Sequence, residues 1–140
     1  MRRIMGIDYG DARVGVAVSD PLGITAQGVA TLANKVFDNM LRSLDKLILE
    51  YAPKTIVLGL PKNMDGTEGV RAEISNQFAK ILKDTYPDIS VVLWDERLTT
   101  VLADRYLSAT KTRGKQRKQV VDTVAASLIL QSYLDQNSVK

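Results

Sequence analysis

The sequence predicts an α/β fold in which a five-stranded mixed sheet carries helices on both faces. Two observations lead to this class. The first third of the chain contains apolar runs with a two-residue period, separated by turn residues, which is typical of an antiparallel meander. The remainder alternates helical patterns with short apolar runs, which favours parallel strands joined by right-handed crossovers. A length of 140 residues is enough for one full core, so we expect one domain over residues 1–140.

The meander is predicted from three apolar runs and the turns between them. The first strand covers Ile4–Asp8 and ends at the turn signal Tyr9-Gly10-Asp11. The second, Val14–Val18, alternates large and small residues. After a turn at Asp20–Gly23, the third strand is predicted to run over Ile24–Leu32. Tight turns of this kind place the three strands side by side in antiparallel order.

The pattern then changes to alternating helices and strands. Apolar residues at helical spacing predict a helix between Phe37 and Tyr51, which Pro53 ends. The wholly apolar run Thr55–Leu60 is typical of a strand buried on both faces. A second helix follows, and we expect one of its faces to be apolar through Val70, Ile74, Phe78 and Ile81.

The last part of the chain predicts one more strand and two helices. The strand covers Ile89–Trp94 and is followed by the charged residues Asp95 and Glu96. A helix is expected over about 100–107, a loop over 108–114 and a final helix over about 116–134. The complete order β-β-β-α-β-α-β-α-α places two parallel strands beside the meander.

Composition restricts the possible chemistry. The chain has no Cys and no His, which excludes disulfides, thiolate nucleophiles, Cys/His zinc sites and an imidazole base. An enzyme with this composition must use carboxylates, Lys, Arg, hydroxyls or a hard metal ion. The sequence also has no apolar run long enough to span a membrane and no signal-peptide pattern, so we expect a cytoplasmic location.

Positive charge is concentrated in one segment. The net charge of the chain is +3, but residues 97–118 contain seven basic residues and one acid, so the remaining residues sum to −3. A local basic stretch on a near-neutral chain indicates an anionic partner, while a solvated loop and helix start is the simpler alternative.

Three carboxylates stand where apolar residues are expected. Asp8 ends an apolar strand, although it could also cap the hairpin. Asp95 and Glu96 follow another strand and should point to opposite faces, so at most one of them belongs to a site. Asp122 heads an apolar helical stripe, where an unpaired charge is costly; a first-turn acid that favours the helix dipole is the alternative. The stripe consists of Ala125, Ala126, Ile129 and Tyr133.

The expected topology can bring these acids together. The carboxyl ends of the first, fourth and fifth strands lie at one edge of such a sheet, where ligands bind in open α/β folds. Asp8, Glu96 and Asp122 would repel one another there unless cations lie between them. Two Mg²⁺ or Mn²⁺ ions would meet this need, one activating water and one stabilising a leaving oxygen.

Five motifs follow one another along the chain. They are Gly6-Ile7-Asp8-Tyr9-Gly10, Arg13–Asp20, Gly59–Gly66, Asp95-Glu96-Arg97-Leu98-Thr99-Thr100, and Asp122–Ala126 leading to Ile129-Leu130-Gln131. With these motifs in this order, the chain resembles the YqgF family of Holliday-junction-resolvase-like proteins, within the ribonuclease-H-like superfamily. The resemblance covers essentially the full length.

The resemblance implies a ribonuclease-H-like fold and a cytoplasmic, metal-dependent nuclease. It implies that Asp8, Glu96 and Asp122 match the acidic triad and hold Mg²⁺ or Mn²⁺. The substrate would be the end of pre-16S ribosomal RNA or branched DNA, with ribosomal precursor particles as possible partners and a monomer or homodimer as the working form. Residues expected to contact nucleic acid are Arg13, Lys111, Arg113, Lys115, Arg117 and Lys118.

The loop after the fourth strand and the function of the chain each allow alternatives. Asn63 and Asp65 could line the site or simply form a turn before Gly66. A ribosome-assembly factor that binds nucleic acid without cutting it is an alternative function. An actin-like or sugar-kinase-like ATPase is another, because the first motif resembles the phosphate motif of that superfamily, but such proteins need two domains of this fold.

Overall fold

A computed structural model of the chain describes residues 3–99 and 114–137, and its centre is a five-stranded sheet with the order β3-β2-β1-β4-β5. The strands are β1 (Ile4–Tyr9), β2 (Arg13–Ser19), β3 (Ala26–Ala33), β4 (Thr55–Leu60) and β5 (Ser90–Asp95). The first three pair antiparallel, and β4 pairs parallel with both β1 and β5. The predicted mixed sheet is therefore confirmed.

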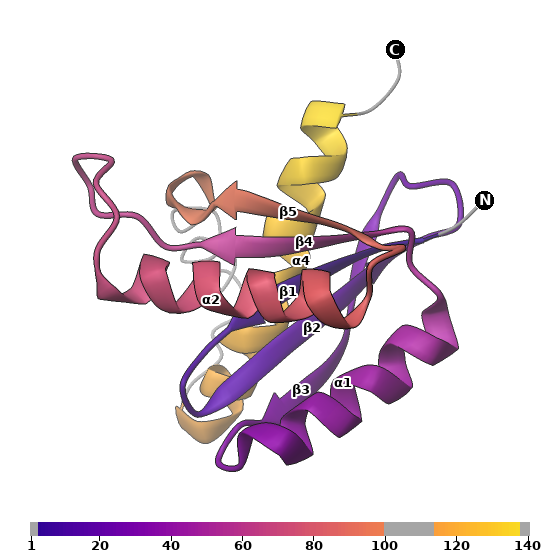
Figure 1. Ribbon diagram of the computed structural model, residues 1–140. Coiled ribbons are helices and arrows are strands. Elements are labelled where there is room, and N and C mark those ends of the chain that lie inside the picture. Colours follow the sequence, from indigo (N-terminus) through magenta and orange to yellow (C-terminus); the bar gives the residue numbers. More distant parts are fainter. Residues whose placement is uncertain (1–2, 100–113, 138–140) are drawn as a thin grey trace.

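Helices cover both faces of the sheet (Figure 1). On one face lie α1 (Phe37–Tyr51) and α2 (Val70–Thr85), and on the other lies α4 (Gly114–Asn137). A short 3-10 turn, η1 (Glu96–Leu98), follows β5. The predicted helix over 100–107 and most of the predicted loop over 108–114 lie outside the described residues. None of the helices in the described part of the chain combines the length and apolar character that a membrane crossing requires.

The larger core lies between the sheet and the helices α1 and α2. It contains Met5 and Ile7 of β1, and the α1 residues Met40, Leu44 and Ile48. The apolar face predicted for α1 is confirmed, and the helix ends at Ala52, whose positive φ of 44° turns the chain ahead of Pro53. Alternate β1 residues point to the other face, where α4 packs.

Helix α2 is turned relative to the prediction. Val70 is 74% exposed and Ile81 37%, although both were expected in the core with Phe78. The buried face consists instead of Ala72, Ser75, Phe78, Ala79 and Leu82. Small residues on this face allow the helix to approach the sheet closely, while Val70 lies in the first turn on the side that faces solvent.

The third strand begins two residues later than predicted. The Asp20 carboxylate accepts hydrogen bonds from the amides of Ile24 and Thr25, at 2.7 and 2.8 Å. These bonds keep the chain in the turn, so β3 begins at Ala26 and Ile24 remains exposed. A side chain that competes for backbone amides in this way favours turns over strands.

Candidate active site at the carboxyl edge of the sheet

Two of the three predicted acids meet at one edge of the sheet. The parallel pairing of β1, β4 and β5 places the carboxyl ends of these strands together. Asp8 lies near the end of β1, and Glu96 follows directly after β5. Their carboxyl groups come close enough to share a hydrogen bond. The strand order therefore positions these two acids as the sequence predicted.

The environment of this pair makes full ionisation costly. Burial, together with the charge of the adjacent Asp8 carboxylate and the hydrogen bond the two groups share, raises the pKa of Glu96 to about 8. The positive charge of Arg71 works in the opposite direction. The two carboxyl groups therefore retain a proton near neutral pH when nothing else neutralises them.

Gly59 of β4 provides the space that Glu96 occupies. A Cβ atom at Gly59 would lie 2.6 Å from the Glu96 Oε1 atom and 2.7 Å from the Cδ1 atom of Ile129. A carbon atom cannot approach non-bonded atoms that closely, so any side chain here would displace the carboxyl group or the Ile129 side chain of α4. The Glu96 carboxyl therefore rests directly on the backbone of the sheet.

Asp95 has a different role from its neighbour. Its carboxylate forms a two-point ion pair with Arg97, whose Nη2 atom lies 2.7 Å from Oδ2 and whose Nε atom lies 3.1 Å from Oδ1. The Arg97 amide also donates to Asp95 at 3.0 Å, and these bonds hold the pKa of Asp95 below its usual range. The two neighbouring acids thus differ in partner and in the direction of the pKa shift, and only Glu96 meets Asp8.

The loop after β4 is held by its own side chains. The Asp65 carboxylate accepts hydrogen bonds from the Thr67 amide at 3.0 Å and the Thr67 hydroxyl at 2.6 Å, and Asn63 donates to the same hydroxyl at 3.0 Å. Gly66 adopts a φ of 89°, which a glycine tolerates. These contacts favour the turn interpretation of Asn63 and Asp65 over a direct contact with a ligand.

Helix α4 packs closely on β1 and carries the third predicted acid. A Cβ atom at Gly6 would lie 2.7 Å from the Leu130 Cβ atom and 3.0 Å from the carbonyl oxygen of Ala126, so the helix touches the strand backbone. Asp122 lies one helical turn before Ala126, but its side chain is outside the described residues. The structure therefore shows where Asp122 lies along α4, and the contacts of its carboxylate lie outside the described part of the chain.

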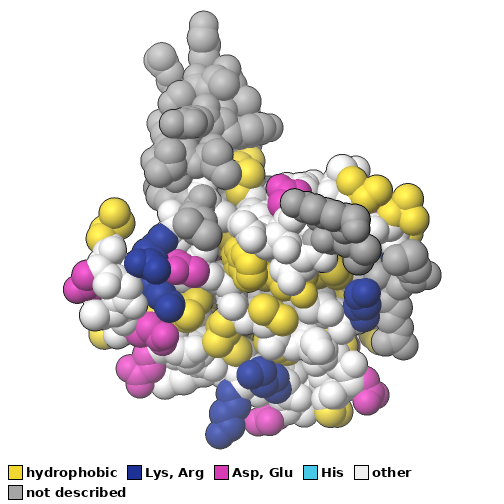
Figure 2. Space-filling view, turned by 90° about the horizontal axis from the view of Figure 1, so that it is seen from above, with side chains coloured by type: hydrophobic (Ala, Val, Ile, Leu, Met, Phe, Trp, Pro, Cys, Tyr) yellow, Lys and Arg dark blue, Asp and Glu magenta, His cyan; other side chains and the backbone are white. Residues whose placement is uncertain are grey.

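The predicted nucleic-acid contacts are only partly within the described residues. Arg13 begins β2 at the same edge as Asp8. Lys111 and Arg113 lie outside the described residues, as do the side chains of three residues near the start of α4: Lys115, Arg117 and Lys118. On the face shown in Figure 2, the coloured basic side chains are scattered among acidic ones. The described surface there offers no continuous basic patch.

Sequence reasoning missed Arg71, which acts electrostatically on Glu96. A usable signal existed, because Arg71 lies in the first turn of a helix, where the helix dipole disfavours a cation. An arginine in this position is better explained by a nearby negative charge or ligand. The close approach at Gly59 left no comparable signal, since one glycine in an apolar strand has many explanations.

The donor chemistry at this edge fits a hard divalent cation. Within the part of the chain that the structure describes, no group of three carboxylate ligands is arranged to hold a metal ion. Asp8 and Glu96 nevertheless supply two adjacent groups of oxygen donors, which Mg²⁺ and Mn²⁺ prefer. A cation here would also offset the repulsion that raises the pKa of Glu96.

The fold places the chain in a known structural class. The crystal structure of the fowlpox virus Holliday junction resolvase matches 96% of this chain and 98% of its own, with 13% identity and a TM-score of 0.58. The RuvC protein of Thermus thermophilus in complex with a Holliday junction substrate covers 100% of this chain and 99% of its own, with 12% identity and a TM-score of 0.56. The chain therefore has the RuvC-like, ribonuclease-H-like fold.

Sequence comparison then identifies the family. Residues 2–136 match the model described as "RuvX: Holliday junction resolvase", and the chain belongs to this family. Two similar relatives, from Acetivibrio thermocellus and Bacillus subtilis, are both named "Putative pre-16S rRNA nuclease". The first is 47% identical over 134 residues and the second 50% over 135, and the alignments cover 95% of this chain and 95% and 97% of the relatives.

Proposed function

We propose that this chain is a metal-dependent nuclease that hydrolyses phosphodiester bonds in structured nucleic acid. The observation that carries the proposal is the pairing of Asp8 with Glu96 at the carboxyl edge of the sheet. With no Cys and no His in the chain, carboxylates that hold a cation are the available means of activating water.

Asp8, Glu96 and Asp122 would hold the divalent ions, which we take to be two Mg²⁺ or Mn²⁺. Ions at such a site activate water and stabilise the leaving oxygen. Asp8 and Glu96 contribute their paired carboxyl groups, and the Gly59 backbone keeps Glu96 in place. Arg71 adds a positive charge beside the pair, which favours the approach of an anionic strand.

We propose the end of pre-16S ribosomal RNA as the substrate, ahead of Holliday-junction-like DNA. Relatives at 47% and 50% identity carry a pre-16S rRNA name, whereas the resolvase structures share 12–13% identity and support the fold alone. The basic run from Lys111 to Lys118 would bind backbone phosphates, which position a strand without reading its sequence. A cytoplasmic protein that meets ribosomal precursor particles as a monomer or homodimer is consistent with this function.

The experiment compares substrates and variants in parallel. Purified protein is incubated with Mg²⁺ or Mn²⁺ and labelled precursor ribosomal RNA, single-stranded RNA or a four-way DNA junction. We expect cleavage of precursor RNA that requires the metal and that Asp8→Asn abolishes, while circular dichroism shows that the variant is folded. An amide is nearly the same size as the carboxylate, so the charge is the main change.

The main competing function is a ribosome-assembly factor that binds nucleic acid without cutting it. It predicts tight binding to precursor RNA and no cleavage with either metal ion. Cleavage by Asp8→Asn at the rate of the wild type would also contradict the proposed site, because the activity would then come from other residues or from a contaminant.

A further inference from the structure

A narrow notch opens on the α2 side of the same edge. It is lined by side chains of the β1–β2 turn, the end of β4 and the first turns of α2: Tyr9, Asp11, Pro61, Arg71, Ile74 and Ser75. The notch has a cavity volume of about 10 Å³. That is room for a single water molecule or a group of the same size, and too little for a base or a whole phosphate.

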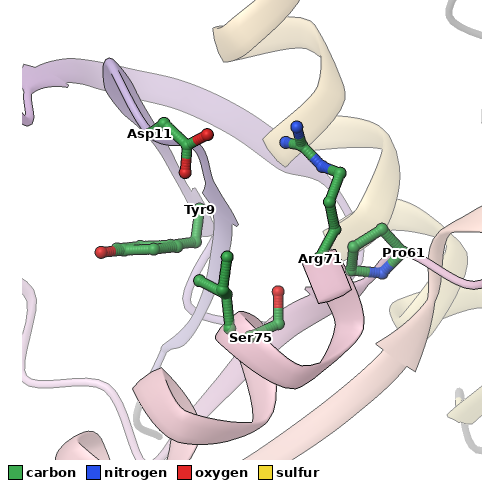
Figure 3. A pocket seen from close by; sticks show the side chains of 6 residues that line it. Tyr9, Asp11, Pro61, Arg71 and Ser75 are labelled. Atoms are coloured by element: carbon green, nitrogen blue, oxygen red, sulfur yellow. The ribbon is translucent and has the colours of Figure 1, made fainter. Parts of the chain in front are cut away.

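The floor of the notch contains a buried hydroxyl group, that of Ser75, with no hydrogen-bond partner among the described residues. Ser75 is only 2% exposed, and among the described residues no hydrogen bond reaches its side chain. Leaving a buried hydroxyl unsatisfied is unfavourable, so such groups usually meet a water molecule or a ligand. In Figure 3 the Ser75 oxygen points into the space between Tyr9 and Arg71.

The mouth of the notch carries one donor and one acceptor of opposite charge. Figure 3 shows Asp11 on the β1–β2 turn and Arg71 on α2 at opposite sides of the opening. Both residues are exposed. Together with Ser75 they suit a neutral group that donates one hydrogen bond and accepts others, because the two charges cancel. A hydroxyl group has this chemistry and fits the volume.

The notch lies close to the paired carboxyl groups. Tyr9 follows Asp8 in β1, and the Arg71 charge lowers the pKa of Glu96, which would otherwise be higher still. A nucleic-acid strand whose phosphate is at Asp8 and Glu96 would therefore pass the mouth of the notch with a neighbouring sugar. The sugar hydroxyl that differs between RNA and DNA is the 2′-hydroxyl.

We propose that the notch formed by Ser75, Asp11 and Arg71 receives a ribose 2′-hydroxyl of the substrate strand and so selects RNA over DNA. This inference rests on the proposed nuclease function and adds a residue-level reason for the choice of substrate. In the free protein a water molecule would fill the same space, and the ribose hydroxyl would replace it while reproducing its hydrogen bonds.

The test combines one protein hydroxyl with one substrate hydroxyl. A cleavable RNA is prepared as a set of strands, each with a single 2′-deoxynucleotide at one position around the cut. We expect one position at which the deoxy substitution lowers kcat/KM of the wild type about tenfold, which is typical of a lost hydrogen bond. In Ser75→Ala the same substitution should have no further effect, because the partner is already absent. Ser90→Ala, an exposed serine at the opposite end of β5, is the matched control and should behave as the wild type.

Binding measurements separate this inference from the proposed function. The same set of strands is titrated with the Asp8→Asn variant, with and without Ser75→Ala, so that cleavage is not needed. At one position, the 2′-deoxy substitution should weaken binding only when Ser75 is present. That result, together with no cleavage by the wild type, would contradict the nuclease function and support the notch. If the effects of the 2′-deoxy substitution and of Ser75→Ala on binding add at every position, the notch proposal is wrong and the nuclease function is not affected. Equal cleavage of RNA and DNA by the wild type would have the same meaning.

Discussion

Replacing Glu96 with glutamine should stabilise the metal-free protein at and above neutral pH. The folded protein holds the Glu96 proton up to a pKa of about 8, against an ordinary value of 4.5. Between these two values the folded state binds more protons than the unfolded state, so the free energy of unfolding falls as the pH rises. At 1.36 kcal/mol per pH unit, the full loss is about 5 kcal/mol as an upper value.

Glutamine removes this pH dependence. It has nearly the same shape as the glutamic acid, carries no charge, and can donate a hydrogen bond from its amide to Asp8. We therefore expect wild type and Glu96→Gln to have similar stability at pH 4.5 and the variant to be several kcal/mol more stable at pH 8.5. The measurement is urea unfolding with a chelator at a series of pH values, followed by the fluorescence of Trp94, the single tryptophan, and by circular dichroism.

The neighbouring acid is the matched control. Hydrogen bonds from Arg97 hold the pKa of Asp95 below its usual range, so its ionised form contributes stability that is lost only at acid pH. Asp95→Asn should therefore destabilise the protein at neutral pH, which is the opposite sign. If wild-type stability does not fall between pH 5 and 8, or if Glu96→Gln is the less stable protein at pH 8.5, the buried pairing with Asp8 is wrong.

Three further predictions concern the rest of the site. Gly59→Ala should lower activity strongly and stability by about 1–3 kcal/mol, because the added methyl group collides with Glu96; thermal unfolding and cleavage rates measure both. Asp122→Asn should abolish cleavage and raise the melting temperature in chelator near neutral pH, and excess Mg²⁺ should stabilise the wild type more than this variant. The third prediction concerns three basic residues of α4, namely Lys115, Arg117 and Lys118. Replacing all three by alanine should weaken RNA binding. It should also reduce the slope of log binding constant against log salt concentration by roughly 0.7 to 0.9 per lost phosphate contact, which titrations at several salt concentrations would measure.

Most of the fold was predictable because its signals are local. The helix bounds Phe37–Tyr51 and the strand Thr55–Leu60 follow from periodicity and from Pro53, and the structure reproduces both. The face that α2 buries was predicted wrongly, because the sequence favours the largest apolar residues while the packing uses small ones such as Ala72 and Ala79. How closely two elements approach is a property of the whole assembly and not of one segment.

The site was predictable where topology alone decides position. Parallel strands that end at one edge bring Asp8 and Glu96 together, and this could be inferred from the order of elements. The influence of Arg71 and the burial of the Ser75 hydroxyl could not be inferred, because both depend on how α2 is turned against the sheet. The ligand roles of Asp8, Glu96 and Asp122 remain predictions that the experiments above address.

The bare backbone at Gly6 and Gly59 has a consequence for how this sequence can vary. Helix α4 lies against both glycines, and Gly59 is also in contact with the Glu96 carboxyl group. A change at one neighbour cannot make room for a side chain at either position, because the obstacle at Gly6 includes the main chain of the helix and the obstacle at Gly59 consists of two side chains, Glu96 and Ile129. In a library that samples every single substitution, these two positions should accept almost no other residue, even though glycine has no functional group that could take part in the reaction. A position that accepts no substitution can therefore be one where a side chain has no room, and it need not be one that takes part in the reaction.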